Sequence, residues 1–224
     1  MSFPFHNNSA NLAAIAHHWQ EIRNQQSQVA IQAQQIAHGR NAALLSSPGF
    51  EREGELLLQA EILVIGDKTK EGQLIQAVAV PWFEIITEWK RDPEFIFRLK
   101  PRQLEELVAG AYQKAGCDEV ILTPASGDRG RDVIVTVTYP GIGVVRIVDQ
   151  VKRYAKGHRV DADEVRALLG VLARDSNVSK GIVTTTSEFA PGITGELAAF
   201  IPTRLELKNG SQLQEWLLGL TGQG

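Results

Sequence analysis

Apolar residues near the start of the chain recur at alternating steps of three and four. The series is Leu12, Ile15, Trp19, Ile22, Gln26, Val29, Ala33 and Ile36, with Gln26 as its one polar member. Such a heptad pattern predicts a helix whose apolar seam must pack against another helix. An intramolecular helical hairpin and a coiled-coil homodimer would both satisfy this requirement, so a homodimer through this helix is one of two expectations.

The chain then continues as short apolar segments. A Pro and a Gly at 48–49 break the heptad pattern. The run at 56–65 fits a helix or a strand, and 73–80 is predicted to be helical, although its length also fits a strand. A further helix at 81–89 would bury its two tryptophans and two isoleucines. We therefore predict a mainly helical region at 1–92 that serves oligomerisation or partner docking.

From residue 93 the pattern changes to a mixture of helices and strands. The helix predicted at 101–116 carries an apolar stripe, and the strand at 132–138 has valine at every second position. Further strands are predicted at 120–123, 144–152, 181–185 and 204–207, and further helices at 161–174, 192–200 and 211–218. This order predicts an α/β domain at 93–224, with a mixed sheet flanked by helices and a hairpin in its middle.

Composition narrows the class of protein. The 224 residues are 43% hydrophobic and 22% charged, which is typical of a globular chain. The single cysteine, Cys117, excludes an internal disulfide and any zinc site built on several cysteines. A formal net charge of −3 argues against a generally basic nucleic-acid coat. With no bilayer-spanning apolar run and no signal-peptide pattern, we expect a cytoplasmic protein without a membrane partner.

The predicted hairpin brings polar residues together at its open end. If its turn centres on Gly141, Asp132 lies opposite Gln150, and Lys152 points to the same face as Gln150. Such a group suits metal-assisted phosphodiester hydrolysis, with a carboxylate for Mg²⁺, an amide as a weaker ligand and an ammonium for charge stabilisation. The spacing alone is weakly specific, because a turn aspartate and a solvated lysine at a strand end are common.

Five ordered blocks make the pattern more specific. They read PRQLEELVAGAYQKAG, LTPASGDRGRDVIV, VDQVKRYAKGHRV, EVRALLGVL and SKGIVTTTSEF. Together they resemble the Mrr-like restriction endonuclease family of the PD-(D/E)xK nuclease superfold, over about residues 93–218. The resemblance implies a prokaryotic, Mg²⁺-dependent DNA endonuclease, for which Mn²⁺ can substitute, often directed at modified or foreign DNA.

The resemblance also assigns residues. The family's metal-binding acid falls on Asp132, and its Glu/Gln-x-Lys motif falls on Gln150 and Lys152. The family's helix glutamate falls on Glu105, which also borders the apolar stripe of its helix, whereas Glu106 lies nearly opposite that stripe. Many relatives carry Glu where this chain has Gln150. The amide weakens the charge available for a metal, so Glu105 or a substrate phosphate is expected to complete the site.

A basic cluster follows the expected catalytic lysine. We predict contact with the phosphate backbone of DNA, and a solvated loop is the alternative. The predicted DNA-binding residues are Lys152, Arg153, Tyr154, Lys156, Arg159 and Arg129. Hydroxyl groups at 184–187 are expected to cap a turn rather than bind phosphate.

The leading hypothesis is thus an endodeoxyribonuclease of the restriction type. A repair or junction-resolving nuclease of the same fold is one alternative, distinguished by its substrate. A DNA-binding or sensor module that does not cleave is another, which the amide of Gln150 motivates. A scaffold with no nucleic-acid partner is the last.

Overall fold

The computed structural model describes residues 50–125, 130–141 and 143–221. The predicted heptad helix at 12–36 and its homodimer lie outside these residues. The helices are α2 (Phe50–Leu57), α3 (Val80–Arg91), the 3₁₀ helix η1 (Phe95–Arg98), α4 (Pro101–Lys114), α5 (Ala162–Arg174), α6 (Ile193–Glu196) and α7 (Gly210–Thr221). The strands are β1 (Leu63–Lys68), β2 (Gln73–Val78), β3 (Glu119–Leu122), β4 (Val133–Tyr139), β5 (Gly143–Lys152), β6 (Arg159–Val160), β7 (Lys180–Thr185), β8 (Glu188–Phe189) and β9 (Leu205–Lys208).

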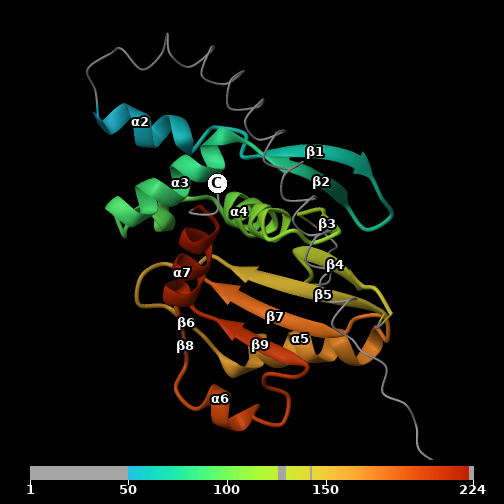
Figure 1. Ribbon diagram of the computed structural model, residues 1–224. Coiled ribbons are helices and arrows are strands. Elements are labelled where there is room, and N and C mark those ends of the chain that lie inside the picture. Colours follow the sequence, from blue (N-terminus) through green and yellow to red (C-terminus); the bar gives the residue numbers. More distant parts are fainter. Residues whose placement is uncertain (1–49, 126–129, 142, 222–224) are drawn as a thin grey trace, which may run out of the picture. The chain divides into compact units, whose positions relative to one another are not determined.

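Seven strands form one mixed sheet, in the order β1-β2-β3-β4-β5-β7-β9 (Figure 1). Neighbours from β1 to β5 are antiparallel, whereas β5, β7 and β9 run parallel to one another. The short strands β6 and β8 pair separately. The predicted mixed sheet with a central hairpin is confirmed, and β5 is the strand at which antiparallel pairing changes to parallel pairing.

Helices bury both faces of this sheet. Val133, Val135 and Val151 belong to one apolar cluster together with residues of α3, α4 and α7. Ile134 and Val148, which point to the opposite face, belong to a second cluster together with residues of α5. The uninterrupted apolar run at 133–135, which begins β4, follows from this burial on both sides.

The predicted helix at 73–80 is wrong, because residues 73–78 form β2. Gln73 and Leu74 of β2 pair with Leu122 and Ile121 of β3, more than forty residues later in the chain. β2 also forms a hairpin with β1, in which Lys68 pairs with Gln73. Periodicity in a short apolar run reveals neither hydrogen-bonding partner. The predicted helix at 192–200 is also much shorter, since α6 spans only Ile193–Glu196.

The described residues before position 93 share a core with those after it. The indole Nε1 of Trp82 in α3 donates a hydrogen bond to the carbonyl oxygen of Leu107 in α4 at 2.9 Å. Gly110 permits this approach, because a Cβ atom there would lie 2.5 Å from the same Nε1. The described residues form one compact unit. The change in sequence pattern near residue 93 therefore does not mark a break in packing within the described residues.

Candidate active site

The hairpin of β4 and β5 has the register that its turn predicts. The pairs run from Val133 with Asp149 to Tyr139 with Gly143. Asp132 lies one residue beyond this ladder, and its backbone N–H donates to the carbonyl oxygen of Asp149 at 3.0 Å. Its carboxylate oxygen Oδ2 accepts a hydrogen bond from the backbone N–H of Val151 at 2.6 Å. The carboxylate of Asp132 therefore lies against the stretch of β5 that carries the expected Gln-x-Lys motif.

Gln150 lies beside a glycine of the loop that leads into Asp132. Gly130 has a φ of +75°, and a Cβ atom there would lie 2.8 Å from Nε2 of Gln150. Both Asp132 and Gln150 are buried, each with 8% of its surface exposed. Oε1 of Gln150 is a buried atom with no hydrogen-bond partner among the described residues. Since a buried amide oxygen without a partner is costly, this atom is a candidate ligand for a cation.

Carboxylate and amide oxygens are ligands that Mg²⁺ accepts in proteins, so Asp132 and Gln150 fit a divalent metal chemically. Within the described parts of the chain, no three His, Cys, Asp or Glu residues are grouped so that they could hold a metal ion. Such a grouping does not include the amide of Gln150 or a phosphate oxygen of a bound substrate, either of which could also be a ligand.

Lys152 ends β5, and β7 fixes its backbone. The hydroxyl of Thr185 donates to the carbonyl oxygen of Lys152 at 2.9 Å, and the N–H of Thr186 donates to the same oxygen at 3.2 Å. The ammonium of Lys152 lies 3.8 Å from Oε1 of Glu164 in α5. The threonine hydroxyls therefore join two strands at the end of the site. The Thr185 hydroxyl also accepts a hydrogen bond from the N–H of Ser187, which is the expected turn cap. Thr185 therefore both caps the turn and joins β7 to β5.

Among the described residues, Glu105 is connected to Asp132 through Arg102 and Thr123. Its carboxylate pairs with Nη1 of Arg102 at 2.8 Å, and the same nitrogen donates to the carbonyl oxygen of Thr123 at 2.7 Å. The N–H of Thr123 in turn donates to the carbonyl oxygen of Asp132 at 3.0 Å. The side chain of Glu105 is 15% exposed and that of Glu106 is 27% exposed, in line with the expected difference between them. Burial is the main cause that raises the pKa of Glu106.

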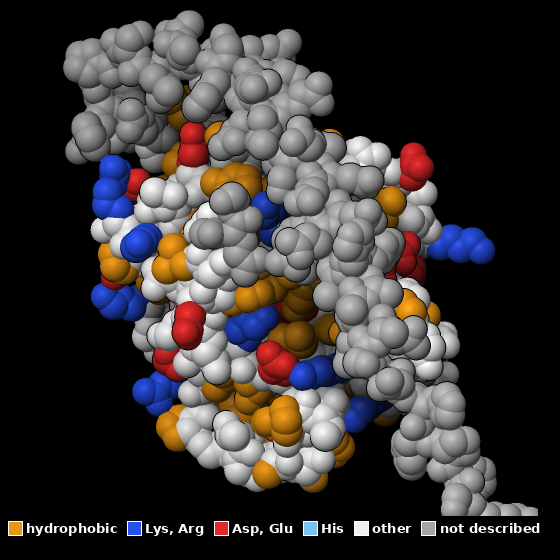
Figure 2. All heavy atoms as spheres, in the orientation of Figure 1, with side chains coloured by type: hydrophobic (Ala, Val, Ile, Leu, Met, Phe, Trp, Pro, Cys, Tyr) orange, Lys and Arg blue, Asp and Glu red, His pale blue; other side chains and the backbone are white. Residues whose placement is uncertain are grey.

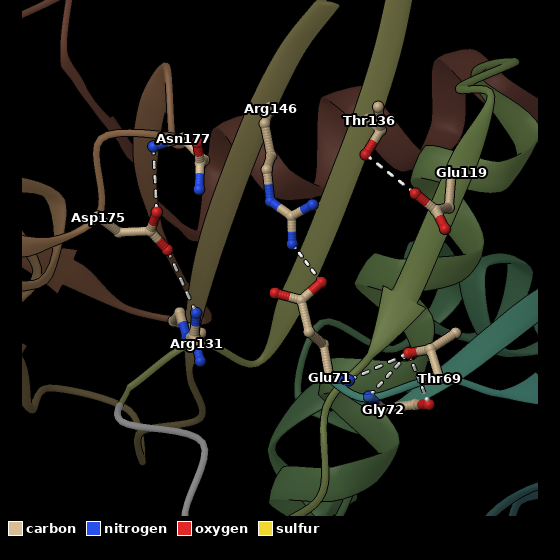
Figure 3. A network of polar contacts seen from close by, with 9 residues as sticks. All are labelled: Thr69, Glu71, Gly72, Glu119, Arg131, Thr136, Arg146, Asp175 and Asn177. Carbon is tan, nitrogen blue, oxygen red and sulfur yellow. Dashed lines mark hydrogen bonds and ion pairs between the residues drawn. The ribbon is translucent and has the colours of Figure 1, made fainter.

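Ion pairs hold the segments that flank the site (Figure 3). Arg131, the neighbour of Asp132, pairs with Asp175 at the C-terminal end of α5 at 3.5 Å. Glu71, in the loop between β1 and β2, pairs with Arg146 in β5. The first pair fixes the entry to Asp132, and the second ties the β1–β2 loop to the strand that carries Gln150 and Lys152.

The basic cluster after Lys152 is partly engaged within the chain. Arg153 donates to the carbonyl oxygen of Phe97 at 3.3 Å, and Lys156 pairs with Glu94 at 2.7 Å. Arg159 is exposed on β6, and Arg129 lies outside the described residues. In the coloured part of the face in Figure 2, Lys and Arg side chains are interspersed with Asp and Glu. Any phosphate contact on this face would therefore be local.

Tyr154, which was predicted to bind DNA, makes two contacts within the cluster. Its hydroxyl donates to Oε1 of Glu164, and its ring centroid lies 4.2 Å from that of His158. Burial, followed by the hydrogen bond and charge of Glu164, raises the pKa of Tyr154 to about 12. The phenol therefore stays protonated and acts as a donor at neutral pH.

Asp149 was not recognised from the sequence. Its carboxylate is fully buried and accepts hydrogen bonds from Tyr112 in α4 and Thr184 in β7, each at 2.8 Å. Burial raises the pKa of Asp149 to about 6, and the charge of Lys208 opposes that rise. The sequence feature that could have identified Asp149 is its position one residue before Gln150, on the face of β5 that α4 covers. This network links α4, which carries Glu105, to the strand that carries Gln150 and Lys152.

The mixed sheet with its central antiparallel hairpin has the arrangement expected of the restriction endonuclease fold. The model of the Mrr catalytic domain, described as a restriction endonuclease, matches residues 96–217. This match covers more than half of the chain, so the chain belongs to that restriction endonuclease family.

Two solved structures are similar to the chain. One is the DNA modification-dependent restriction endonuclease AspBHI, with 19% sequence identity, a TM-score of 0.42, and coverage of 74% of this chain and 45% of that one. The other is the MspJI restriction endonuclease in complex with a 27-mer oligonucleotide, with 16% identity, a TM-score of 0.39, and coverage of 79% and 32%. The chain thus spans less than half of the length of either protein. A comparison with curated proteins found no match. None of the helices in the described residues is long and apolar enough to cross a membrane.

Proposed function

We propose that this chain is a Mg²⁺-dependent endodeoxyribonuclease that acts in the restriction of foreign or modified DNA. The observation that carries the proposal is the position of two oxygen donors. The carboxylate of Asp132 is fixed on the backbone of β5, and the unpartnered Oε1 belongs to the neighbouring Gln150. Lys152 follows on the same strand. Membership of the restriction endonuclease family supports DNA as the substrate.

The residues divide into a metal-binding and a charge-stabilising group. Asp132 and Gln150 would hold the metal, with Glu105 or a phosphate oxygen of the substrate as a further ligand. A bound Mg²⁺, or Mn²⁺ in its place, would polarise the scissile phosphate and lower the pKa of a bound water. Lys152 would stabilise the negative charge that develops on the phosphate in the transition state. The backbone N–H of Val151 holds the Asp132 carboxylate in place.

The basic cluster supplies the proposed contact with DNA. Arg153, Lys156 and Arg159, together with Arg129 and Tyr154, would contact the phosphate backbone, which positions the substrate without reading its sequence. A homodimer through the predicted heptad helix would bring two active sites to the two strands of a duplex.

Cleavage of supercoiled plasmid tests the function. Methylated and unmethylated plasmids are incubated with Mg²⁺, Mn²⁺ or EDTA and with the wild type, Asp132→Ala or Lys152→Ala. Asp67→Ala and Lys68→Ala serve as matched controls, because they remove the same kinds of charge at exposed positions of β1. We expect metal-dependent nicking that the two site variants abolish and the two control variants retain. Nicking that survives in both site variants would refute the assignment.

A second candidate function is a DNA-binding module that does not cleave. The amide of Gln150 favours it, because an amide attracts a divalent cation less strongly than the carboxylate of a glutamate. Stable DNA binding without any cleavage, with either metal and either plasmid, would support this candidate. If Gln150→Glu then gained nicking activity, the missing charge would be the reason.

A further inference from the structure

Glu164, in the first turn of α5, is the acidic residue in contact with the expected catalytic lysine. We propose that Glu164 is a positioning residue that holds the Lys152 ammonium at the end of β5. This inference rests on the proposed function, because it assigns a partner to a residue of that same site. It adds a residue that was not among the site residues predicted from the sequence.

Both oxygens of the Glu164 carboxylate are engaged. Oε1 accepts the hydroxyl of Tyr154 and lies 3.8 Å from Nζ of Lys152. Oε2 accepts the backbone N–H of Asp161 at 3.1 Å, and the N–H of Glu164 donates to Asp161 Oδ1 at 2.9 Å. These last two bonds form a capping box at the start of α5. Because the capping box fixes the carboxylate, its position does not depend on Lys152.

Lys152 has the opposite character. Its backbone is anchored by Thr185 and Thr186, but its side chain has four rotatable bonds and considerable conformational entropy. An ammonium that must stabilise charge in the transition state is effective only when its position is set beforehand. A fixed carboxylate beside it restricts that freedom before the substrate arrives.

The separation suits positioning better than sequestration. A direct N⁺–H···O⁻ hydrogen bond has a heavy-atom distance of about 2.7–2.9 Å. The 3.8 Å distance between Nζ and Oε1 is longer than this, so the ammonium lies in the field of the carboxylate while its donors stay available for a phosphate oxygen. The phenol of Tyr154 takes the shorter contact to the same oxygen.

The alternative role of Glu164 is a helix cap and nothing more. Glu164→Gln separates the two roles, because the amide oxygen still accepts the N–H of Asp161 while the negative charge is lost. Glu196→Gln is the matched control. Glu196 in α6 pairs at 2.6 Å with Arg166, which belongs to α5 as Glu164 does, and this pair lies on the exposed surface. Glu164→Asp retains the charge on a shorter side chain and tests for partial rescue.

Two measurements on the full chain test the proposal. The first is single-turnover plasmid cleavage with protein in excess, beside DNA affinity measured with Ca²⁺ in place of Mg²⁺. We expect Glu164→Gln to slow cleavage about tenfold, with DNA affinity within about twofold of the wild type. Glu164→Asp should recover part of the rate, and Glu196→Gln should match the wild type. Equal rates for Glu164→Gln and Glu196→Gln would overturn the proposal.

The second measurement does not need cleavage. Acetylation of Lys152 by an N-hydroxysuccinimide ester of acetate is followed by mass spectrometry. We expect the reaction at Lys152 to be about threefold or more faster in Glu164→Gln than in the wild type, because the ammonium loses its partner. It should be unchanged in Glu196→Gln. An unchanged rate in Glu164→Gln would overturn the positioning role, whereas a wild type that cleaves no DNA would refute the proposed function and leave this result interpretable.

Discussion

Gly130→Ala is expected to damage the site through a single methyl group. Gly130 has a φ of +75°, and a Cβ atom there would lie 2.8 Å from Nε2 of Gln150. Ordinary van der Waals contact begins at 3.4 Å, so the Gln150 side chain would have to move by about 0.6 Å. The amide oxygen that we assign to the metal moves with it. Displacements of about 1 Å in a catalytic group can cost about a hundredfold in rate, so we expect a loss of roughly ten- to a hundredfold.

Backbone strain must be separated from this displacement. An alanine in the left-handed region costs about 1–2 kcal/mol wherever it is placed. Gly141→Ala is the matched control, because Gly141 has a φ of +76° and a Cβ atom there would meet nothing within 4 Å. Both variants should therefore lose similar stability in urea denaturation, while only Gly130→Ala loses cleavage activity.

The assay is the initial rate of plasmid nicking at increasing Mg²⁺ concentrations, with unfolding measured on the same preparations. We expect Gly130→Ala to require more Mg²⁺ for half-maximal activity than either the wild type or Gly141→Ala. If Gly130→Ala and Gly141→Ala cleave equally well, the contact between Gly130 and Gln150 does not shape the metal site, and the reasoning is refuted.

Three further variants test the packing around the site. Trp82→Phe removes the hydrogen bond to the Leu107 carbonyl and should lower the free energy of unfolding by about 1–3 kcal/mol in urea, in a single transition because α3 and α4 share a core. Two separate transitions would contradict that shared core. Tyr112→Phe leaves the buried Asp149 with one donor fewer and should also cost about 1–3 kcal/mol, whereas unchanged stability would show that this bond is unimportant. Glu71→Gln breaks a partly exposed ion pair and should lower the free energy of unfolding by less than about 1 kcal/mol. A larger loss would show that the contact of the β1–β2 loop with β5 contributes strongly to stability.

The central part of the fold follows from local pattern. The alternation of valines in β4 and the turn at Gly141 were sufficient to predict the hairpin and its register. The helix predicted at 161–174 likewise begins where expected, at the capping box of Asp161 and Glu164. These features depend on residues close together in the sequence, where periodicity and turn chemistry determine structure.

Other features depend on contacts between distant segments. β2 lies between β1, its neighbour in the chain, and the distant β3, and the periodicity of its short apolar run reveals neither pairing. The contact between Glu164 and Lys152 joins a helix cap to a strand end, and the burial of Asp149 depends on residues from α4 and β7. The assignment of Asp132, Gln150, Lys152 and Glu105 as catalytic or metal-binding residues remains a prediction.

The central claim is that Asp132 supports metal-dependent cleavage of DNA, and Asp132→Asn tests it most directly. The amide oxygen of Asn can still accept the N–H of Val151, so the fold is retained while the negative charge is lost. The measurement is the single-turnover rate of plasmid cleavage at saturating protein, with Mg²⁺ and with EDTA. We predict cleavage by the wild type that EDTA abolishes, and a rate for Asp132→Asn that is lower by about a hundredfold or more. Equal rates for the two proteins in Mg²⁺ would contradict this account.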